Sequence, residues 1–394
     1  MSRPTCIGII GGGQLGKMIA HEARRMSFKV IVLDPTEGCP AARIADEQIV
    51  ADFKDEQAIM LLAQKCDVLT YEIELANSSA LRQLEERNYP VRPAPESLRI
   101  IQNKYRQKSF LQEHGIAVTE FARVESEEHL RQLCEKFGLP AVLKATEDSY
   151  DGRGNYVIKT KADISKAYAY FAGSEMMLEK FIPFSKEVSV MVARNPSGQI
   201  ESFPVVENVH TNSILDVTTA PARVSKSVEK KAMALAKKTM QVLHGAGIFG
   251  IEMFVTKRGD VMINEIAPRV HNSGHYTNEA CSVSQFEQHL RAVLDLPLAR
   301  PELLSPAAMI NILGPEGFEG PYAVTGLERM MAVPGAALYI YGKKVSKPRR
   351  KLGHVTATGR TVSEALERAR KARNAIKLVP ASSTTTAKEK EAPQ

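Results

Sequence analysis

Residues 249–276 read FGIEMFVTKRGDVMINEIAPRVHNSGHY and contain two strand-like runs around a turn. The first eight residues and the run 260–266 alternate in side-chain character and are rich in Ile, Val, Met and Phe, which predicts a β-hairpin. With a two-residue loop at 258–259, counting outwards brings Glu252 directly opposite Glu265. Carboxylates so placed have Cβ atoms about 4.5 to 5.5 Å apart and repel each other. A divalent cation between them would relieve the repulsion, and Mg²⁺ is commonly held by one or two carboxylates together with substrate phosphates.

The hairpin alone leaves a simpler alternative open, in which two glutamates on an exposed sheet face are merely solvated. The loop that follows the hairpin favours a binding site, because it carries Arg269, His271, Asn272 and His275 and almost no apolar residues. An arginine can grip a phosphate or a carboxylate through two parallel hydrogen bonds, and the other three side chains can donate hydrogen bonds to oxyanions.

Length and composition bound the class of protein. A chain of 394 residues with 44% hydrophobic content has room for two or three packed domains. No segment approaches the roughly 20 apolar residues that span a bilayer, and the apolar stretch 6–10 is too short for a signal-peptide core, so we expect a cytosolic protein without a membrane anchor. Five scattered cysteines without a C-x-x-C pair indicate neither a disulfide framework nor a zinc site. The net charge of +7 is spread along the chain, which favours small anionic substrates over nucleic acid.

The N-terminus reads as a strand, a glycine turn and an amphipathic helix. Gly11, Gly13 and Gly16 match G-x-G-x-x-G, and a second strand ends at Asp34, which together form the dinucleotide-binding fingerprint. Taken alone, this pattern favours an oxidoreductase, although such glycines suit any phosphate-bearing ligand and also a plain tight turn. A third strand at 67–71 leads into two further carboxylates, Glu72 and Glu74, at the sheet edge where ligands bind in such folds.

The rest of the chain carries further candidate ligand contacts. A helix is expected around Lys104, and an apolar strand ends at Lys144. The loop 149–155 has two glycines and an arginine, a composition suited either to closing over a triphosphate or to a surface turn. In a later strand Val188, Val190 and Val192 share one face and leave Glu187 on the other, where its carboxylate is available to a ligand hydroxyl or is merely solvated. Four cations at 347–351 suit a phosphate pocket, a nucleic-acid patch or a solvated turn.

Nine short motifs follow one another along the chain: IIGGGQLGKM, VLDP, TYEIE, YDGRG, EVSVMVAR, APARVS, NEIAPR, HNSGHY and RRKLGHVT. On these motifs the chain resembles the ATP-grasp superfamily and, within it, the N5-carboxyaminoimidazole ribonucleotide synthetases of purine biosynthesis, over everything except the tail. The resemblance implies a mixed α/β and α+β architecture with the ATP-grasp fold. It places a Rossmann-like pre-ATP-grasp domain at 1–102, a small lid domain at 103–184 and a larger C-terminal domain at 185–380. Residues 381–394 lack apolar periodicity and read as a disordered tail.

The resemblance also implies ATP and Mg²⁺ as cofactors, and aminoimidazole ribonucleotide and bicarbonate as substrates that react through carboxyphosphate. The substrate's amine would capture either the activated carboxyl group or CO₂ released from it. ATP would contact Lys104, Lys144, Ser149, Tyr150, Asp151, Gly152, Arg153, Gly154, Asn155, Glu179, Lys180, Phe181, Ile182, Glu187, His210, Asn264 and Glu265. Mg²⁺ would bind Glu252 and Glu265. Bicarbonate and carboxyphosphate would lie on Arg269, His271 and Asn272, and Tyr150 and Asp151 complete the catalytic set. Aminoimidazole ribonucleotide would be surrounded by Gln14, Glu74, Tyr150, Asp151, Arg153, Arg350 and Lys351. A homodimer follows by family analogy, with neither nucleic acid nor a membrane as partner.

Two positions depart from the family pattern. The run Thr146-Glu147-Asp148-Ser149 stands where relatives commonly have paired glycines, which should stiffen the lid and place negative charge near phosphates. Val270 stands where relatives often have proline, a milder change. We therefore expect slower or weaker ATP binding than in glycine-containing relatives, and a lower KM for ATP when glycines are restored at 148 and 149. The alternatives left open are a formate-dependent glycinamide ribonucleotide transformylase on the same scaffold, a nicotinamide dehydrogenase and a non-catalytic nucleic-acid-binding protein.

Overall fold

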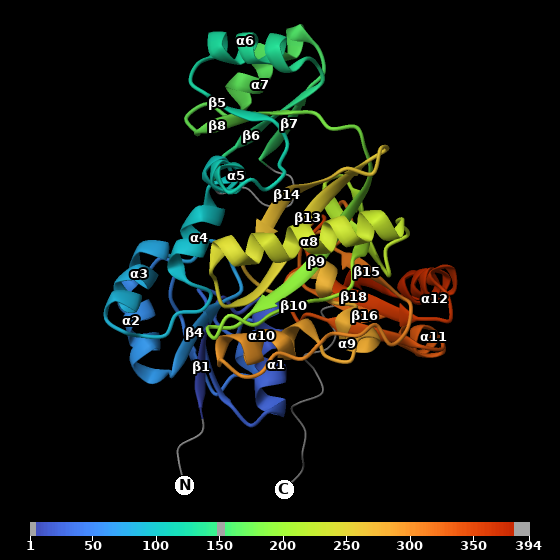
Figure 1. The fold of residues 1–394 in the computed structure, drawn as a ribbon. Coiled ribbons are helices and arrows are strands. Elements are labelled where there is room, and N and C mark those ends of the chain that lie inside the picture. Colours follow the sequence, from blue (N-terminus) through green and yellow to red (C-terminus); the bar gives the residue numbers. More distant parts are fainter. Residues whose placement is uncertain (1–4, 148–153, 382–394) are drawn as a thin grey trace, which may run out of the picture.

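The computed structural model describes residues 5–147 and 154–381. The first part of it is a four-stranded parallel sheet in the order β3-β2-β1-β4, coloured blue in Figure 1. The strand, glycine turn and helix predicted for the N-terminus are confirmed. The elements of this part are β1 (Cys6–Ile10), α1 (Gln14–Arg25), β2 (Lys29–Leu33), η1 (Ala41–Arg43), β3 (Glu47–Ile49), α2 (Glu56–Lys65), β4 (Val68–Tyr71), α3 (Ser78–Glu86) and α4 (Pro95–Gln102).

A second, antiparallel sheet of four strands in the order β5-β8-β6-β7 forms a small lobe together with α6 and α7. Figure 1 shows this small lobe standing away from the rest of the molecule. Helix α5 leads into it from the N-terminal sheet. The bounds are α5 (Lys104–Glu113), β5 (Phe121–Val124), α6 (Glu127–Phe137), β6 (Ala141–Ala145), β7 (Asn155–Ile158), η2 (Lys161–Asp163), α7 (Ile164–Tyr170) and β8 (Met176–Lys180).

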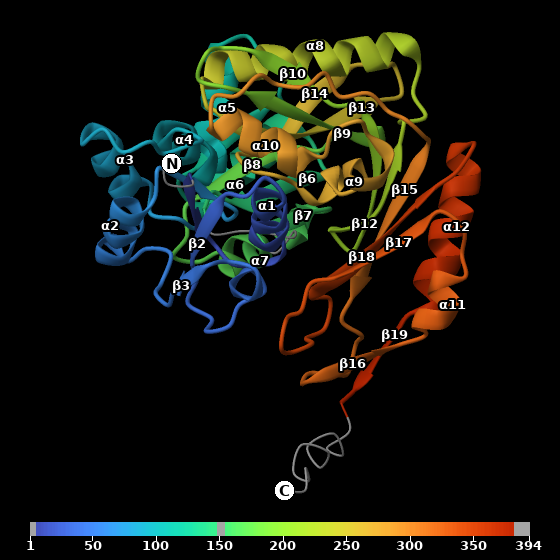
Figure 2. The same ribbon diagram turned by 90° about the horizontal axis from the view of Figure 1, so that it is seen from below.

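The largest sheet has nine strands, eight of them in the order β14-β13-β9-β11-β12-β15-β18-β17, with β10 paired to β9. Its strands are β9 (Phe184–Arg194), β10 (Ile200–Ser202), β11 (Val206–Thr211), β12 (Ile214–Ala220), β13 (Gly247–Thr256), β14 (Val261–Ala267), β15 (Ala307–Leu313), β17 (Ala336–Ile340) and β18 (Lys351–Thr358). Its other elements are α8 (Lys226–Leu243), η3 (Asn272–Gly274), α9 (Thr277–Ala280), α10 (Gln285–Val293), α11 (Leu327–Met331) and α12 (Val362–Ala375). A small ribbon of β16 (Tyr322–Thr325) and β19 (Lys377–Pro380) lies near the C-terminal end, as Figure 2 shows.

The two faces of this sheet have different roles around β9 and β13. Val188, Val190 and Val192 are fully buried against α8, which confirms their shared face. Helix α8 presents apolar side chains at a helical spacing, such as Ala232, Ala236 and Met240, to the same core cluster. Because side chains alternate along a strand, Glu187 and Ser189 lie on the opposite face. That opposite face carries the polar residues discussed below.

The hairpin of β13 and β14 pairs Glu252 with Glu265, as predicted, but the predicted turn is wrong. The loop has three residues, because the Thr256 amide donates to the Asp260 carbonyl and Gly259 adopts a positive φ of 80°. A β-bulge then leaves Asn264 without a partner, since Met253 pairs with Ile263 while Glu252 pairs with Glu265. The longer loop and the bulge each shift the register by one residue, so their effects cancel at the glutamate pair.

The helix expected around Lys104 is two helices. Helix α4 ends at Gln102, and α5 begins at Lys104 with Asn103 as its N-cap, whose side-chain oxygen accepts from the Arg106 amide. The Asn103 amide group also donates to Thr146 Oγ1 and Glu147 Oε1, at 3.3 and 2.9 Å. The break in the helix thereby lies against the strand end that precedes residue 148.

The described part of the chain contains no helix that is both long and apolar enough to cross a bilayer. All five cysteines are free thiols, in line with the expectation of no disulfide framework. Residues 149–153 of the predicted triphosphate loop and 382–394 of the predicted tail lie outside the described residues.

Candidate active site

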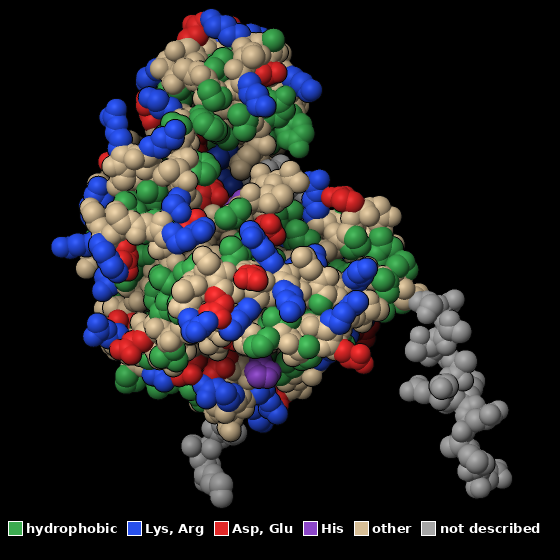
Figure 3. Space-filling view, turned by 90° about the vertical axis from the view of Figure 1, so that its right-hand side faces the viewer, with side chains coloured by type: hydrophobic (Ala, Val, Ile, Leu, Met, Phe, Trp, Pro, Cys, Tyr) green, Lys and Arg blue, Asp and Glu red, His purple; other side chains and the backbone are tan. Residues whose placement is uncertain are grey.

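A cavity of about 1830 Å³ lies between the small lobe, the N-terminal sheet and the large sheet. Figure 3 shows it as a recess beneath the small lobe. Of the site residues that the family resemblance predicted within the described ranges, Gly154 alone does not line it. His275, which the donor-rich loop suggested as a further oxyanion ligand, is buried and does not line it either. The predicted residues that do are Gln14, Glu74, Lys104, Lys144, Asn155, Glu179, Lys180, Phe181, Ile182, Glu187, His210, Glu252, Asn264, Glu265, Arg269, His271, Asn272, Arg350 and Lys351. Residues separated by more than 300 positions in sequence therefore share one cavity.

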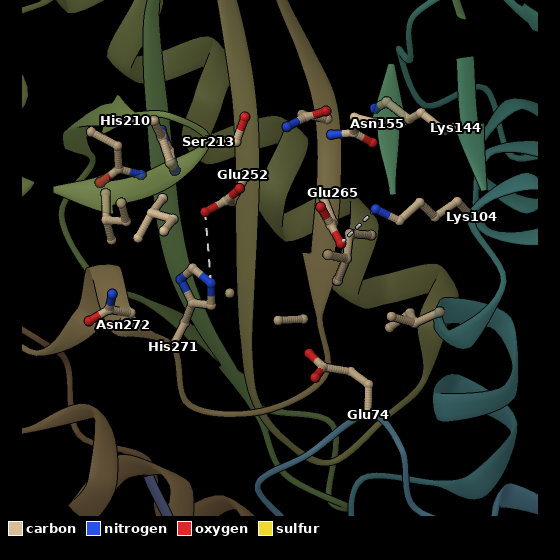
Figure 4. A pocket seen from close by; sticks show the side chains of 18 of the residues that line it. Glu74, Lys104, Lys144, Asn155, His210, Ser213, Glu252, Glu265, His271 and Asn272 are labelled. Carbon is tan, nitrogen blue, oxygen red and sulfur yellow. Dashed lines mark ion pairs between the residues drawn. The ribbon is translucent and has the colours of Figure 1, made fainter. Parts of the chain in front are cut away.

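The carboxylates of Glu252 and Glu265 both point into this cavity, as Figure 4 shows. Burial raises the pKa of Glu252 to about 7, and the neighbouring Glu265 adds to the effect while His210 opposes it. Lys104 Nζ lies 3.6 Å from Glu265 Oε1. The pair therefore favours a bound cation, because the ionised form of Glu252 is under-compensated by the protein alone.

The donor set at this pair fits Mg²⁺ completed by phosphate and water. Two carboxylates and the Asn264 side chain offer oxygen ligands on neighbouring strands, and the bulge brings two consecutive residues, Asn264 and Glu265, to the cavity wall. Among the residues that the structure describes, no group of three or more His, Cys, Asp and Glu side chains forms a complete protein cage for a metal. A site with few protein ligands is the usual arrangement where a metal also binds a nucleotide.

The side chain of His271 lies against strand β13, beside Glu252. Its Nε2 is 3.7 Å from Glu252 Oε1, and its Nδ1 is 2.8 Å from Ser273 Oγ. Gly250 makes this position available, because a Cβ on that residue would meet the His271 Cβ at 2.7 Å. Burial, reinforced by Arg269, lowers the pKa of His271 well below its usual value, so this side chain is neutral.

Arg269 and Asn272 bring unsatisfied polar atoms to the cavity wall. Arg269 Nη2 forms an ion pair with Glu74 Oε1 at 2.7 Å, but Arg269 Nε is buried without a hydrogen-bond partner among the described residues. Both polar atoms of the Asn272 amide are likewise unpartnered there. Buried polar groups normally find a partner, so these atoms indicate a polar ligand at this wall.

Glu187 on β9 and His210 on β11 form a further polar pair in the cavity, with His210 Nδ1 bonded to Glu187 Oε2. Burial would lower the pKa of His210, but the hydrogen bond that it donates to Glu187 and the charge of Glu252 outweigh burial and raise the pKa. Glu187 and His210, which the family resemblance both assigned to ATP, thus lie beside each other in the structure.

Three charged side chains of the small lobe and α5 form a buried network that the sequence had not indicated as a whole. Glu179 Oε2 lies 3.0 Å from Lys144 Nζ, and Glu179 Oε1 lies 3.2 Å from Lys108 Nζ. Burial alone would raise the pKa of Glu179, but the two lysines lower it to about 2. Lys108 was missed, although the spacing K-x-x-x-K from Lys104 places the two lysines one helical turn apart.

The glycine loop of the N-terminal sheet does not offer its amides to a ligand. The Gly13 and Gly16 amides donate to the carboxylate of Glu72, and the Gly12 amide donates to Asp34 Oδ2 at 2.8 Å. Glycine is required at Gly11 and Gly16, because a Cβ would meet Glu72 or the Gly11 carbonyl at about 2.5 Å. The donors that would hold a dinucleotide pyrophosphate are therefore already used by two carboxylates.

Comparison with known proteins gives a consistent result along the chain. Residues 4–102 match the ribonucleotide synthetase preATP-grasp domain, 109–286 the ATP-grasp domain, and 307–368 the phosphoribosylaminoimidazole carboxylase C-terminal domain. The N5-carboxyaminoimidazole ribonucleotide synthase of Bacillus subtilis is 43% identical over 350 residues, which is 89% of this chain and 90% of the relative.

Solved structures agree. The N5-carboxyaminoimidazole ribonucleotide synthetase of Thermotoga maritima superposes with a TM-score of 0.88 at 46% identity, covering 96% of this chain and all of that chain. The Aspergillus clavatus synthase in complex with ADP and 5-aminoimidazole ribonucleotide has a TM-score of 0.87 at 35% identity, covering 94% and 98%.

A longer relative differs in extent. The phosphoribosylaminoimidazole carboxylase of Saccharomyces cerevisiae is 42% identical over 373 residues, but these residues are 65% of its length, so this chain spans about two thirds of that relative. The three matched domains and the full-length bacterial relatives settle the family. This chain belongs to the N5-carboxyaminoimidazole ribonucleotide synthases, ATP-dependent ligases with the ATP-grasp fold.

Proposed function

We propose that this protein uses ATP and bicarbonate to carboxylate the exocyclic amine of 5-aminoimidazole ribonucleotide, giving N5-carboxyaminoimidazole ribonucleotide. The observation that carries the proposal is the facing pair Glu252 and Glu265, set in a cavity that also holds Lys104 and Lys144. Two carboxylates beside two lysines suit a magnesium triphosphate, and the family membership supplies the class of acceptor.

We assign the ATP to the side of the cavity formed by the small lobe. Lys104 and Lys144 would bind its phosphates, and Glu187 would bind its ribose hydroxyls. Residues 179–182, at the end of β8, would hold its base. The side chain of Glu179 forms ion pairs with Lys108 and Lys144, so its role is to position Lys144. When bound at Glu252 and Glu265, Mg²⁺ would neutralise charge on the phosphates during transfer.

The first step joins bicarbonate to the terminal phosphoryl group. An oxygen of bicarbonate attacks the γ-phosphorus, the bond to the β-phosphate oxygen breaks, and ADP and carboxyphosphate result. Phosphoryl transfer depends chiefly on positioning and on stabilising charge. Arg269, His271 and Asn272 would hold the bicarbonate-derived anion. The polar atoms of Arg269 and Asn272 that lack a partner among the described residues support this assignment.

The second step transfers the carboxyl group to nitrogen. The exocyclic amine of 5-aminoimidazole ribonucleotide attacks the carboxyl carbon, inorganic phosphate leaves, and the nitrogen loses a proton. Gln14 and Glu74 would contact this substrate from the N-terminal sheet, and Arg350 and Lys351 would bind its phosphate. The assigned contacts Tyr150, Asp151 and Arg153 belong to residues that the structure does not describe. We further propose a cytosolic location and a homodimer, both by family analogy.

ADP release tests the proposal when each substrate is omitted in turn. We expect release to require ATP, bicarbonate and 5-aminoimidazole ribonucleotide together, with equal amounts of ADP and carboxylated product. Release that ignores bicarbonate and this nucleotide but responds to another acceptor, such as glycinamide ribonucleotide with formate, would contradict it. The dehydrogenase alternative is disfavoured because Glu72 and Asp34 occupy the glycine-loop amides.

A further inference from the structure

A chain of four buried side chains runs beneath the site and ends at His271. Thr218 Oγ1 donates to Asn208 Oδ1 at 2.9 Å, and Asn208 Nδ2 donates to Ser189 Oγ at 2.6 Å. Ser189 Oγ then donates to Ser273 Oγ at 3.0 Å, and Ser273 Oγ lies 2.8 Å from His271 Nδ1. Thr218, Ser189 and Ser273 are fully buried and Asn208 is 5% exposed, so solvent does not compete with these hydrogen bonds.

The strands bring this chain to the metal-binding pair by register. Ser189 on β9 is the cross-strand partner of Glu252 on β13, and Glu252 is the partner of Glu265 on β14. Asn208 on β11 and Thr218 on β12 are partners in turn. All these side chains lie on the face away from α8, so the polar chain is built into the same sheet face that presents the two glutamates.

The hydrogen bonds have a direction. An amide nitrogen can only donate, so the Ser189 oxygen accepts from Asn208. The Ser189 hydroxyl in turn donates to Ser273. The Ser273 proton is then available to His271 Nδ1. The backbone of Ser273 gives an independent indication, because its amide, which has no acceptor capacity, also points at His271 Nδ1 from 3.4 Å. Both donors make Nδ1 an acceptor, which leaves the single proton of a neutral imidazole on Nε2.

The Nε2 proton has no acceptor in the described protein at hydrogen-bonding distance, since the approach to Glu252 Oε1 is 3.7 Å. The ring therefore presents one fixed donor to the cavity at the wall where Arg269 and Asn272 also have unpartnered atoms. A ring held in this tautomer cannot accept a proton at Nε2.

We propose that Thr218, Asn208, Ser189 and Ser273 are positioning residues that lock His271 as the Nε2–H tautomer. In this form His271 serves the reaction as a hydrogen-bond donor to the bicarbonate-derived anion, and not as a general base. The role of the donor rests on the proposed function, whereas the tautomer is a property of the free protein and can be measured without turnover.

Nitrogen-15 NMR of protein labelled at histidine tests the tautomer directly. The protein has nine histidines, and the H271N variant identifies the His271 signals by their absence. In the wild type we expect an unprotonated Nδ1 and a protonated Nε2. In S273A, which keeps only the 3.4 Å amide donor, we expect both nitrogens to shift towards intermediate values as the second tautomer becomes populated. The wild-type spectrum alone decides the tautomer if a variant folds poorly.

Kinetics then separate positioning from folding. We expect S273A to lower kcat about five- to tenfold, the effect of one lost hydrogen bond, with little change in the KM for ATP. S189A should have a smaller effect in the same direction, because the Ser273 hydroxyl remains. S97A is the matched control, since Ser97 is also a buried serine and donates to the Leu243 carbonyl at 2.9 Å, outside the hydrogen-bonded series that ends at His271. It should leave the His271 shifts and kcat unchanged.

Three results would overturn the inference: a proton on Nδ1 in the wild type, wild-type His271 shifts in S273A, or an equal loss of kcat in S97A. If the wild type shows no turnover on the proposed substrates but His271 is the Nε2–H tautomer, the proposed function is refuted and the fixed tautomer of His271 is still supported. The two proposals therefore fail in different ways.

Discussion

Glu252 and Glu265 face each other across β13 and β14, and the bulge at Asn264 lies directly beside them. Like charges opposite each other destabilise a sheet, yet the structure adds Glu187 to the same electrostatic environment and raises the pKa of Glu252 to about 7, mainly by burial. Lys104 Nζ lies 3.6 Å from Glu265 Oε1, while His210 and Lys351 oppose the rise in the pKa of Glu252 without cancelling it. The two facing carboxylates therefore suit a divalent cation bound together with nucleotide.

We expect E252Q and E265Q to weaken the apparent affinity for Mg²⁺ in ADP release. Loss of a residue that merely supports a metal ligand typically lowers metal affinity about 10- to 100-fold, and loss of a direct ligand should lower it at least as much. The measurement is the rate of ADP release as a function of magnesium concentration at saturating ATP. E201Q on β10 is a control, because Glu201 does not line the cavity. Unchanged magnesium dependence in both variants would remove the proposed metal site.

The register of this hairpin shows what a sequence can and cannot predict. Side-chain alternation and the glycine at 259 were enough to predict the hairpin and its facing glutamates. The loop length and the bulge were not predictable, because both depend on backbone hydrogen bonds such as that from the Thr256 amide to the Asp260 carbonyl. The pairing was correct because two one-residue differences cancelled.

Other features depended on contacts between distant segments. The G-x-G-x-x-G pattern correctly predicted a tight turn between β1 and α1, but only the structure shows that Glu72, more than 50 residues later, takes its amides. The network of Lys108, Glu179 and Lys144 joins three separate elements in the same way. The family resemblance predicted residues from distant segments that share the cavity, such as Gln14 and Lys351, which no local pattern in the sequence would have joined.

The carboxylate of Glu72 should stabilise the glycine turn and exclude a dinucleotide. In E72Q one oxygen acceptor becomes an NH₂ group facing a backbone donor, so we expect the free energy of unfolding to fall by about 1–3 kcal/mol. Urea unfolding measures this loss, and E47Q is the control because the pair of Glu47 with Lys65 is exposed and should contribute under about 1 kcal/mol. Titration of the wild type with NAD should show no saturable binding, and saturable binding would contradict this account of the loop.

Stability should depend on pH through Glu279, which accepts a hydrogen bond from the Tyr339 hydroxyl. Burial raises the pKa of Glu279 to about 7 from a usual value of 4.5. The folded state therefore holds a proton that the unfolded state releases at lower pH, so this group lowers stability progressively as the pH rises from about 4.5 to 7. E279Q should remove that loss, and its gain over the wild type should grow to at most about 3 kcal/mol above pH 7. Urea unfolding at several pH values measures the difference, and a difference independent of pH would contradict the assignment.

Lys108 should govern ATP binding without touching the nucleotide. It is 2% exposed, donates to Thr119 Oγ1 at 2.7 Å and shares the carboxylate of Glu179 with Lys144. In K108M the whole charge of Glu179 would fall on Lys144 and hold that ammonium away from a phosphate. Since a hydrogen bond to a charged group is worth about 1.5–3 kcal/mol, we expect the KM for ATP to rise about tenfold or more. Steady-state ADP release measures the change, and K136M on an exposed face of α6 is the control. The double variant K108M/E179Q restores the net positive charge beside the phosphates, so recovery of ATP affinity supports the electrostatic account, whereas a further loss identifies Lys108 as a packing residue.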